Sequence, residues 1–167
     1  MSVPLQPLES LYRAHAAGLL AYFRAQRPIA GAAEDLLHDT FVRAARQLDR
    51  VHAAASPRAY LFGIARHLAL DALRGRPPVA ELLEEPAAEL PADDPRLEPL
   101  RLAIAALPPL HREAIVLKLQ HDLSYAELAH VLDVPLGTVR SRLHHAVRQL
   151  RDALNPAAPA PHENLSP

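Results

Sequence analysis

The chain has 167 residues, with 19 acidic residues, 18 lysines and arginines, 10 histidines and a formal net charge of −1. It contains no cysteine, which excludes disulfides and thiolate zinc sites and is typical of a reducing compartment. Half of the residues are hydrophobic, five are glycine and aromatic residues make up 4%, which favours an all-α fold of one or two small domains. Because no secretion leader and no membrane-spanning apolar run occurs, we expect a soluble, cytoplasmic protein.

Charge is distributed in blocks along the chain. Residues 1–76 carry ten basic and six acidic residues, whereas residues 77–99 carry one basic and seven acidic residues. The acidic block is rich in proline and lacks an apolar period, so we predict a flexible linker over 77–95. The linker separates two domains, 1–76 and 96–154, and the proline- and alanine-rich tail, 155–167, is expected to be disordered.

Two helices are predicted in the first part of the first domain. One covers about residues 7–27 and buries Leu8, Leu11, Tyr12, Leu19, Tyr22 and Phe23. The other covers about residues 32–48 and buries Leu37, Phe41, Ala44, Ala45 and Leu48. Leu36, His38 and Asp39 are expected to be exposed on this second helix, where an apolar side chain between polar ones suits a protein contact.

A third helix is predicted after a loop at residues 48–55. Ser56 and Pro57 supply its N-cap and first-turn proline, and it continues to about Arg74. The apolar residues on this helix that can face a core are Tyr60, Leu61, Ile64, Leu68 and Leu73. Its accessible polar residues are expected to be Arg58, Arg66, His67 and Arg74.

Residues 124–154, SYAELAHVLDVPLGTVRSRLHHAVRQLRDAL, predict a helix-turn-helix. Ser124 and Glu127 form a capping box at the first helix, and Asp133 to Pro135 interrupt the helical pattern before the second helix. The second helix has an apolar stripe of Val139, Leu143, Ala146, Val147, Leu150 and Leu154. Two shorter helices, at about 96–106 and 110–120, are expected to pack beneath it.

The opposite side of this second helix presents hydrogen-bond donors. At 100° per residue, the side chains pointing away from the stripe are Thr138, Ser141, His145 and Arg148. Arg140 and His144 lie on one flank and Arg142 on the other. A helix enters the DNA major groove and reads base edges near its N-terminal end, so this face suits DNA recognition. The alternative is an ordinary solvated polar face.

The segment LSYAELAHVLDVPLGTVRSRLHHAVRQLRDAL resembles region 4 of the extracytoplasmic-function (ECF) sigma factors of bacterial RNA polymerase. In that family this segment holds the −35 promoter element. The resemblance assigns base or phosphate contacts to Arg140, Ser141, His144 and His145. Asp133 stands where the family usually has glycine, which Asp tolerates because it is among the few residues that visit left-handed geometry.

Two earlier stretches resemble region 2 of the same family. EDLLHDTFVRAAR resembles region 2.2, which grips the coiled coil of the polymerase's largest subunit, and this implies polymerase contacts by Asp35, Leu36, His38 and Asp39. SPRAYLFGIARHLALDALRGR resembles regions 2.3 and 2.4, which open the promoter and hold the −10 element. With the loop before it, this stretch implies DNA contacts by Arg50, His52, Ser56, Arg58, Tyr60, Arg66, His67 and Arg74.

The resemblance implies an all-α promoter-specificity subunit whose partners are the polymerase core, promoter DNA and an anti-sigma factor. PRAYLFGIARHLALDALR is also similar to the iron-siderophore subgroup, which is paired with membrane-bound regulators. The histidines lack metal-ligand spacing and no catalytic motif occurs, so we expect no enzyme, cofactor or small-molecule substrate. Two alternatives stay open: a stand-alone helix-turn-helix regulator, and a sigma-like decoy that sequesters a regulatory protein.

Overall fold

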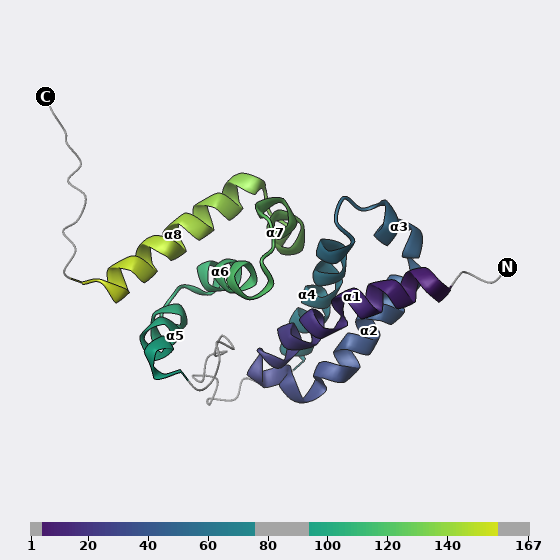
Figure 1. The fold of residues 1–167 in the computed structure, drawn as a ribbon, viewed down its shortest axis with the longest axis horizontal. Coiled ribbons are helices and arrows are strands. Elements are labelled where there is room, and N and C mark those ends of the chain that lie inside the picture. The colour runs from purple at the N-terminus through teal and green to yellow at the C-terminus, as the bar shows by residue number, and fades with distance from the viewer. Residues whose placement is uncertain (1–4, 76–93, 157–167) are drawn as a thin grey trace, which may run out of the picture.

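The computed structural model describes residues 5–75 and 94–156, and within these ranges all regular structure is helical (Figure 1). The N-terminal half, residues 5–75, contains α1 (Leu5–Arg24), the 3₁₀ helix η1 (Arg27–Ala32), α2 (Ala33–Arg46), α3 (Leu48–Ala53) and α4 (Pro57–Arg74). The C-terminal half, residues 94–156, contains η2 (Pro95–Leu97), α5 (Glu98–Ala105), α6 (Pro109–His121), α7 (Tyr125–Leu132) and α8 (Leu136–Leu154). None of the described helices has the length and apolar character that a bilayer crossing requires. The all-α prediction is confirmed; the predicted linker up to residue 93 and the tail from residue 157 lie outside the described residues.

Helices α1, α2 and α4 pack against one another to form the centre of the N-terminal half. Its fully buried side chains include Leu19, Phe23, Ile29, Val51 and Leu61. Tyr12, predicted to be buried, is half-exposed, although its ring still packs on Phe41 with centroids 4.9 Å apart.

Two burial predictions on α2 are wrong. Leu36 is only 8% exposed and belongs to the core, whereas Ala45 is exposed. The buried stripe of α2 is Ala33, Leu36, Leu37, Thr40, Phe41 and Ala44, whose spacing of three and four is that of a single helix face. Leu36 is buried because α2 packs against both α1 and α4, and Ala45 lies about 100° around the helix from Ala44.

The predicted loop at residues 48–55 is wrong over most of its length, because α3 occupies Leu48–Ala53 and buries Val51. Six residues give fewer than two helical turns, too few to show a period in the sequence. The predicted start of α4 is confirmed: Pro57 is the first helical residue, and Ser56 Oγ accepts a hydrogen bond from the Ala59 amide at 3.1 Å.

The helix-turn-helix is formed by α7 and α8, and its capping box is present in full. Ser124 Oγ accepts from the Glu127 amide at 3.1 Å, and Glu127 Oε2 accepts from the Ser124 amide at 2.8 Å. Asp133 adopts the left-handed conformation, with φ 53° and ψ 50°. Both α5 and α6 pack against α8, as predicted.

The predicted apolar stripe of α8 is too wide at one edge. Val139, Leu143, Ala146 and Leu150 are buried, whereas Val147 and Leu154 are exposed. These two residues lie about 50–70° from the centre of the buried stripe. Their predicted burial is therefore wrong.

Asp133→Gly is expected to stabilise the protein by about 0.5–1 kcal/mol, because glycine adopts left-handed φ without the steric cost of a Cβ atom. Thermal unfolding of the variant measures the gain. Asp39→Gly, in the middle of α2 and exposed, is the matched control and should lose about 0.5 kcal/mol. Equal losses for both variants would contradict a strained backbone at Asp133.

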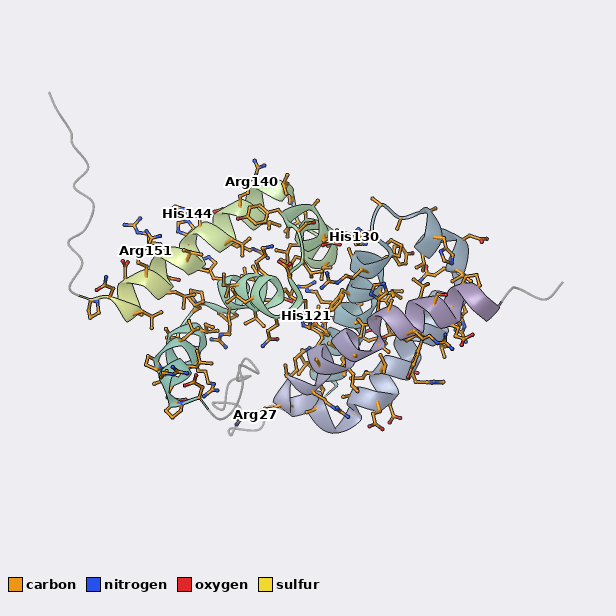
Figure 2. The ribbon with its side chains drawn as sticks, viewed as in Figure 1. Arg27, His121, His130, Arg140, His144 and Arg151 are labelled. Atoms are coloured by element: carbon orange, nitrogen blue, oxygen red, sulfur yellow. The ribbon has the colours of Figure 1, made fainter. Side chains whose placement is uncertain are left out.

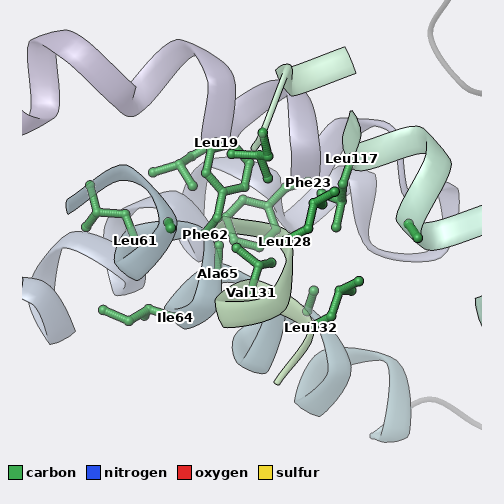
Figure 3. Close-up of a cluster of buried hydrophobic side chains, with 14 of the residues drawn as sticks. Leu19, Phe23, Leu61, Phe62, Ile64, Ala65, Leu117, Leu128, Val131 and Leu132 are labelled. Carbon is green, nitrogen blue, oxygen red and sulfur yellow. The ribbon is translucent and has the colours of Figure 1, made fainter. Parts of the chain in front are cut away.

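The two halves of the chain are in contact, and α4 packs against α7. Figure 3 shows Phe62 and Ala65 of α4 close to Leu128 and Val131 of α7, within one cluster of buried side chains. Leu19 and Phe23 of α1 and Leu117 of α6 complete this part of the cluster. One face of α4, the helix that resembles the −10 region, therefore lies against the C-terminal half.

Candidate nucleic-acid interface

The predicted recognition face of α8 is open to solvent. Five of these donors, Arg140, Ser141, His144, His145 and Arg148, are exposed, and Thr138 and Arg142 are half-buried on one flank of the helix. Figure 2 shows Arg140 and His144 projecting from the side of α8 that faces away from the rest of the chain. A row of donors on the free side of a capped helix-turn-helix can contact base edges and phosphates in a major groove.

Arg151 extends this row and was missed in the sequence prediction. It is exposed near the C-terminal end of α8 and projects on the same side as Arg140 and His144 (Figure 2). Eleven residues make about three helical turns, so Arg151 repeats the direction of Arg140. The same helical arithmetic applied one turn further would have found it.

His145 is held against α6. Its ring stacks on that of His111 with centroids 5.6 Å apart and an interplanar angle of 13°, and His111 Nδ1 lies 3.5 Å from Gln149 Oε1. The adjacent His144 ring is turned by 71° from that of His145. Within the ranges that the structure describes, no group of three or more His, Cys, Asp or Glu side chains is placed to hold a metal ion.

The eight residues predicted for the −10 element divide into two groups. Arg50, His52, His67 and Arg74 are exposed, and Arg74 makes a surface ion pair with Asp71 at 3.5 Å. The other four turn toward the C-terminal half. Arg58 and Arg66 contact α6, and Ser56 and Tyr60 contact α7. The expected free accessibility of Arg58 and Arg66 is therefore wrong, because other side chains cover them.

Arg66 makes the best-formed of these contacts. Its Nε and Nη2 atoms donate to the two carboxylate oxygens of Glu113 on α6, at 2.6 and 3.2 Å. The side chains of Arg66 and Glu113 are only 16% and 26% exposed. The hydrogen bonds that Arg66 donates to this carboxylate raise the pKa of Arg66 above its usual range. The bidentate geometry and the partial burial make this ion pair stronger than a typical surface ion pair.

Ser56 links the N-termini of α4 and α7. While it caps α4, its hydroxyl donates to Glu127 Oε1 at 2.7 Å. Burial of Glu127 acts to raise its pKa, but the hydrogen bonds from Ser124 and Ser56 prevail and lower it. Glu127 therefore stays ionised and accepts hydrogen bonds from the caps of both helices.

Two further residues of α4 contact the C-terminal half: Arg58 contacts the end of α6, and the Tyr60 ring contacts α7. Arg58 donates to the backbone oxygen of His121, and its guanidinium lies 5.9 Å from the centre of the Phe62 ring. The Tyr60 ring stacks on His130 of α7 with centroids 5.8 Å apart, and both histidines lie where the two halves meet (Figure 2).

His121 is buried at this contact. Its ring packs on Phe62 with centroids 4.8 Å apart and lies near Tyr22 of α1. Burial, with a further contribution from the positive charge of Arg58, lowers the pKa of His121 to about 4. The histidine is therefore neutral at physiological pH.

Two hollows adjoin the −10 residues. One, of about 700 Å³, is walled on one side by Ala53, Ala54 and Ala55 before α4, and on the other side by Glu127 and His130 of α7. The second, of about 520 Å³, is lined by Arg43, Arg46, Gln47, Asp49 and Arg50. Arg43 and Arg46 were missed in the sequence prediction, since only the folded connection from α2 to α3 brings them to Arg50.

The residues predicted to bind polymerase are not equally placed. Asp35, His38 and Asp39 are exposed on α2, whereas Leu36 is buried. The candidate contact surface on α2 therefore consists of polar side chains, and Leu36 supports it from within the core.

Comparisons with known proteins agree with this arrangement. Residues 11–77 match the family model of Sigma-70 region 2, and residues 97–150 match that of Sigma-70, region 4. The ECF RNA polymerase sigma factor SigE of Mycolicibacterium smegmatis is 38% identical over 133 residues, which are 73% of this chain and 51% of the relative. SigL of Mycobacterium tuberculosis is 34% identical over 153 residues, 86% of each chain. The chain thus spans about half the length of SigE but most of SigL.

Solved structures show the same fold. The structure of CnrH in complex with the cytosolic domain of CnrY has a TM-score of 0.64 and 26% identity, and the match covers 90% of this chain and 89% of that one. RpoE of Bartonella quintana, in complex with the anti-sigma factor NepR, has a TM-score of 0.68 and 24% identity, covering 92% and 99%. The region 2 and region 4 matches and the identity to SigL place the chain in the extracytoplasmic-function group of the sigma-70 RNA polymerase sigma factors.

Proposed function

We propose that this sigma factor brings polymerase core to promoters by holding the −35 element with α8 and the −10 element with α4 and the residues before it. The exposed donor row of α8, on a helix-turn-helix in the half that matches region 4, is the observation that carries the −35 assignment. The −10 assignment rests on the region 2 match and on the arginines of α4. Asp35, His38 and Asp39 are the proposed polymerase contacts.

An anti-sigma factor is the proposed regulator. The related RpoE was solved with the anti-sigma factor NepR, and CnrH with the cytosolic domain of CnrY. The likeness of α4 to the iron-siderophore subgroup leads us to propose a membrane-bound regulator, with the sigma factor itself acting in the cytoplasm.

Transcription reconstituted from the purified chain and polymerase core tests the proposed function against its alternatives. Of the three candidates, only a sigma factor would confer promoter-specific initiation on core enzyme. A stand-alone regulator would bind its DNA without polymerase and would not support initiation, whereas a decoy would bind neither core nor promoter. Either of these results would overturn the proposal.

Arg140→Ala is expected to relax selectivity at one base pair of the −35 element by about 1–3 kcal/mol. A bidentate arginine contact with guanine discriminates against a wrong base by this free energy, and Arg140 is exposed in the first turns of α8. Arg148→Ala, farther along the same face, should weaken all sequences alike and reduce the salt dependence. Binding of both variants to a library of −35 sequences at fixed salt measures the difference. Equal losses across the library for Arg140→Ala would make this residue a phosphate contact instead.

A further inference from the structure

We infer that the chain blocks its own surface for the −10 element. The carboxylates of Glu113 and Glu127, in the C-terminal half, accept the hydrogen bonds of Arg66 and Ser56 that DNA would otherwise accept. This inference rests on the proposed −10 role of α4. We call the contacts of Arg66 with Glu113 and of Ser56 with Glu127 the interdomain clasp.

The chemistry of the clasp resembles that of a phosphate contact. Arginine binds carboxylate and phosphate through the same fork of parallel N–H donors. The two carboxylate oxygens of Glu113 accept hydrogen bonds from Nε and Nη2 of Arg66, at 2.6 and 3.2 Å. Because Arg66 is only 16% exposed in this state, a phosphate could bind it only after α6 moves away.

The rest of the proposed −10 surface is covered in the same way. The Ser56 hydroxyl donates to Glu127, Arg58 donates to the His121 backbone oxygen, and Tyr60 stacks on His130. The hollow beside the residues before α4 has α7 as its opposite wall. An unstacked base needs an open pocket and a free ring or edge to contact, so both must be uncovered before DNA binds.

Apolar packing alone would not give this pairing of acids with arginine and serine. Phe62 and Leu128 are buried between the halves and would hold them together in several orientations. The clasp fixes one orientation, because two separate carboxylates from α6 and α7 meet two separate donors of the −10 surface. Arg50, His52, His67 and Arg74 stay exposed and leave DNA a partial first contact.

The test uses the full chain without polymerase or regulator. Since the chain has no cysteine, Ala45→Cys and Ala153→Cys, both exposed, introduce one labelling site in each half. Glu113→Gln removes the charge that pairs with Arg66. Glu98→Gln is the control, because it removes one equal charge from an exposed carboxylate of the same half, which pairs with Arg101 on its own helix. The readouts are the distance between labels and the affinity for a random-sequence single-stranded 20-mer at fixed salt.

Glu113→Gln should lengthen the label distance and bind the single strand about tenfold more tightly, since breaking a partly buried pair strongly disfavours the closed form. Glu98→Gln should leave the distance unchanged and raise affinity by no more than about twofold. Adding Arg66→Gln to Glu113→Gln removes the charge left unpaired on Arg66, so the label distance should shorten again and the gain in affinity should be lost. Adding Glu127→Gln to Glu113→Gln should open the halves further, while leaving glutamine as an acceptable partner in the capping box of α7.

The outcomes separate the clasp from the proposed function. An unchanged distance and affinity for Glu113→Gln would overturn the clasp. A longer distance with no gain in affinity would uphold the clasp as a contact but overturn the −10 role of Arg66, and with it the inhibition. A gain equal to that of Glu98→Gln would show a general charge effect and overturn the inference.

Discussion

Asp35→Arg combined with Asp39→Arg is expected to abolish binding to polymerase core while lowering the free energy of unfolding by less than about 1 kcal/mol. Both carboxylates are exposed on α2, so reversing their charge changes the surface without entering the core. The cost comes mainly from Asp35, which lies in the first turn, where the helix dipole favours negative charge. Pull-down of core with the tagged chain and thermal unfolding measure the two effects.

Leu36→Arg shows why the choice of residue matters. Leu36 is 8% exposed within the core of the N-terminal half, and a charge there would lack a partner. This change is expected to unfold that half, at a cost of several kcal/mol. Loss of polymerase binding by Leu36→Arg would therefore report unfolding. Core binding that survives in the Asp35 and Asp39 double variant would show that this face of α2 is not the polymerase contact.

Local chemistry made the helix ends predictable. Ser124 with Glu127, Ser56 with Pro57, and Asp133 before Pro135 are signals confined to a few neighbouring residues. All three appear in the structure as a capping box, an N-cap and a left-handed helix end. Such features follow from the hydrogen-bonding needs of the backbone and require no knowledge of distant residues.

The clasp could not be predicted in the same way. Arg66 and Glu113 are 47 residues apart, and Ser56 and Glu127 are 71 residues apart. A polar residue on a helix surface has the same pattern in the sequence whether it faces solvent, DNA or another helix. Leu36 is a different case, since its stripe was visible at positions 33, 36, 37, 40, 41 and 44 but its burial depended on packing against two helices.

His121 makes the contact between the two halves sensitive to acid. Its imidazole is buried against Phe62, and within the described residues its Nε2 atom makes no hydrogen bond. The pKa is lowered to about 4, from an ordinary value of 6.5, by burial and by Arg58. The state in which His121 is exposed therefore binds a proton more readily than the closed state. The closed state is fully stable above about pH 6.5 and loses stability as the pH falls toward 4.

The expected loss at pH 5 is about 2 kcal/mol, which follows from these two pKa values. His121→Phe should remove most of it, because a neutral ring of similar shape keeps the packing on Phe62. Some pH dependence should remain, since burial also lowers the pKa of His15 on α1. His52→Phe, at an exposed site, is the control and should keep the full loss. Urea unfolding of the three proteins at pH 7 and pH 5 measures the effect, and an equal loss in all three would mean that protonation of His121 does not open the contact.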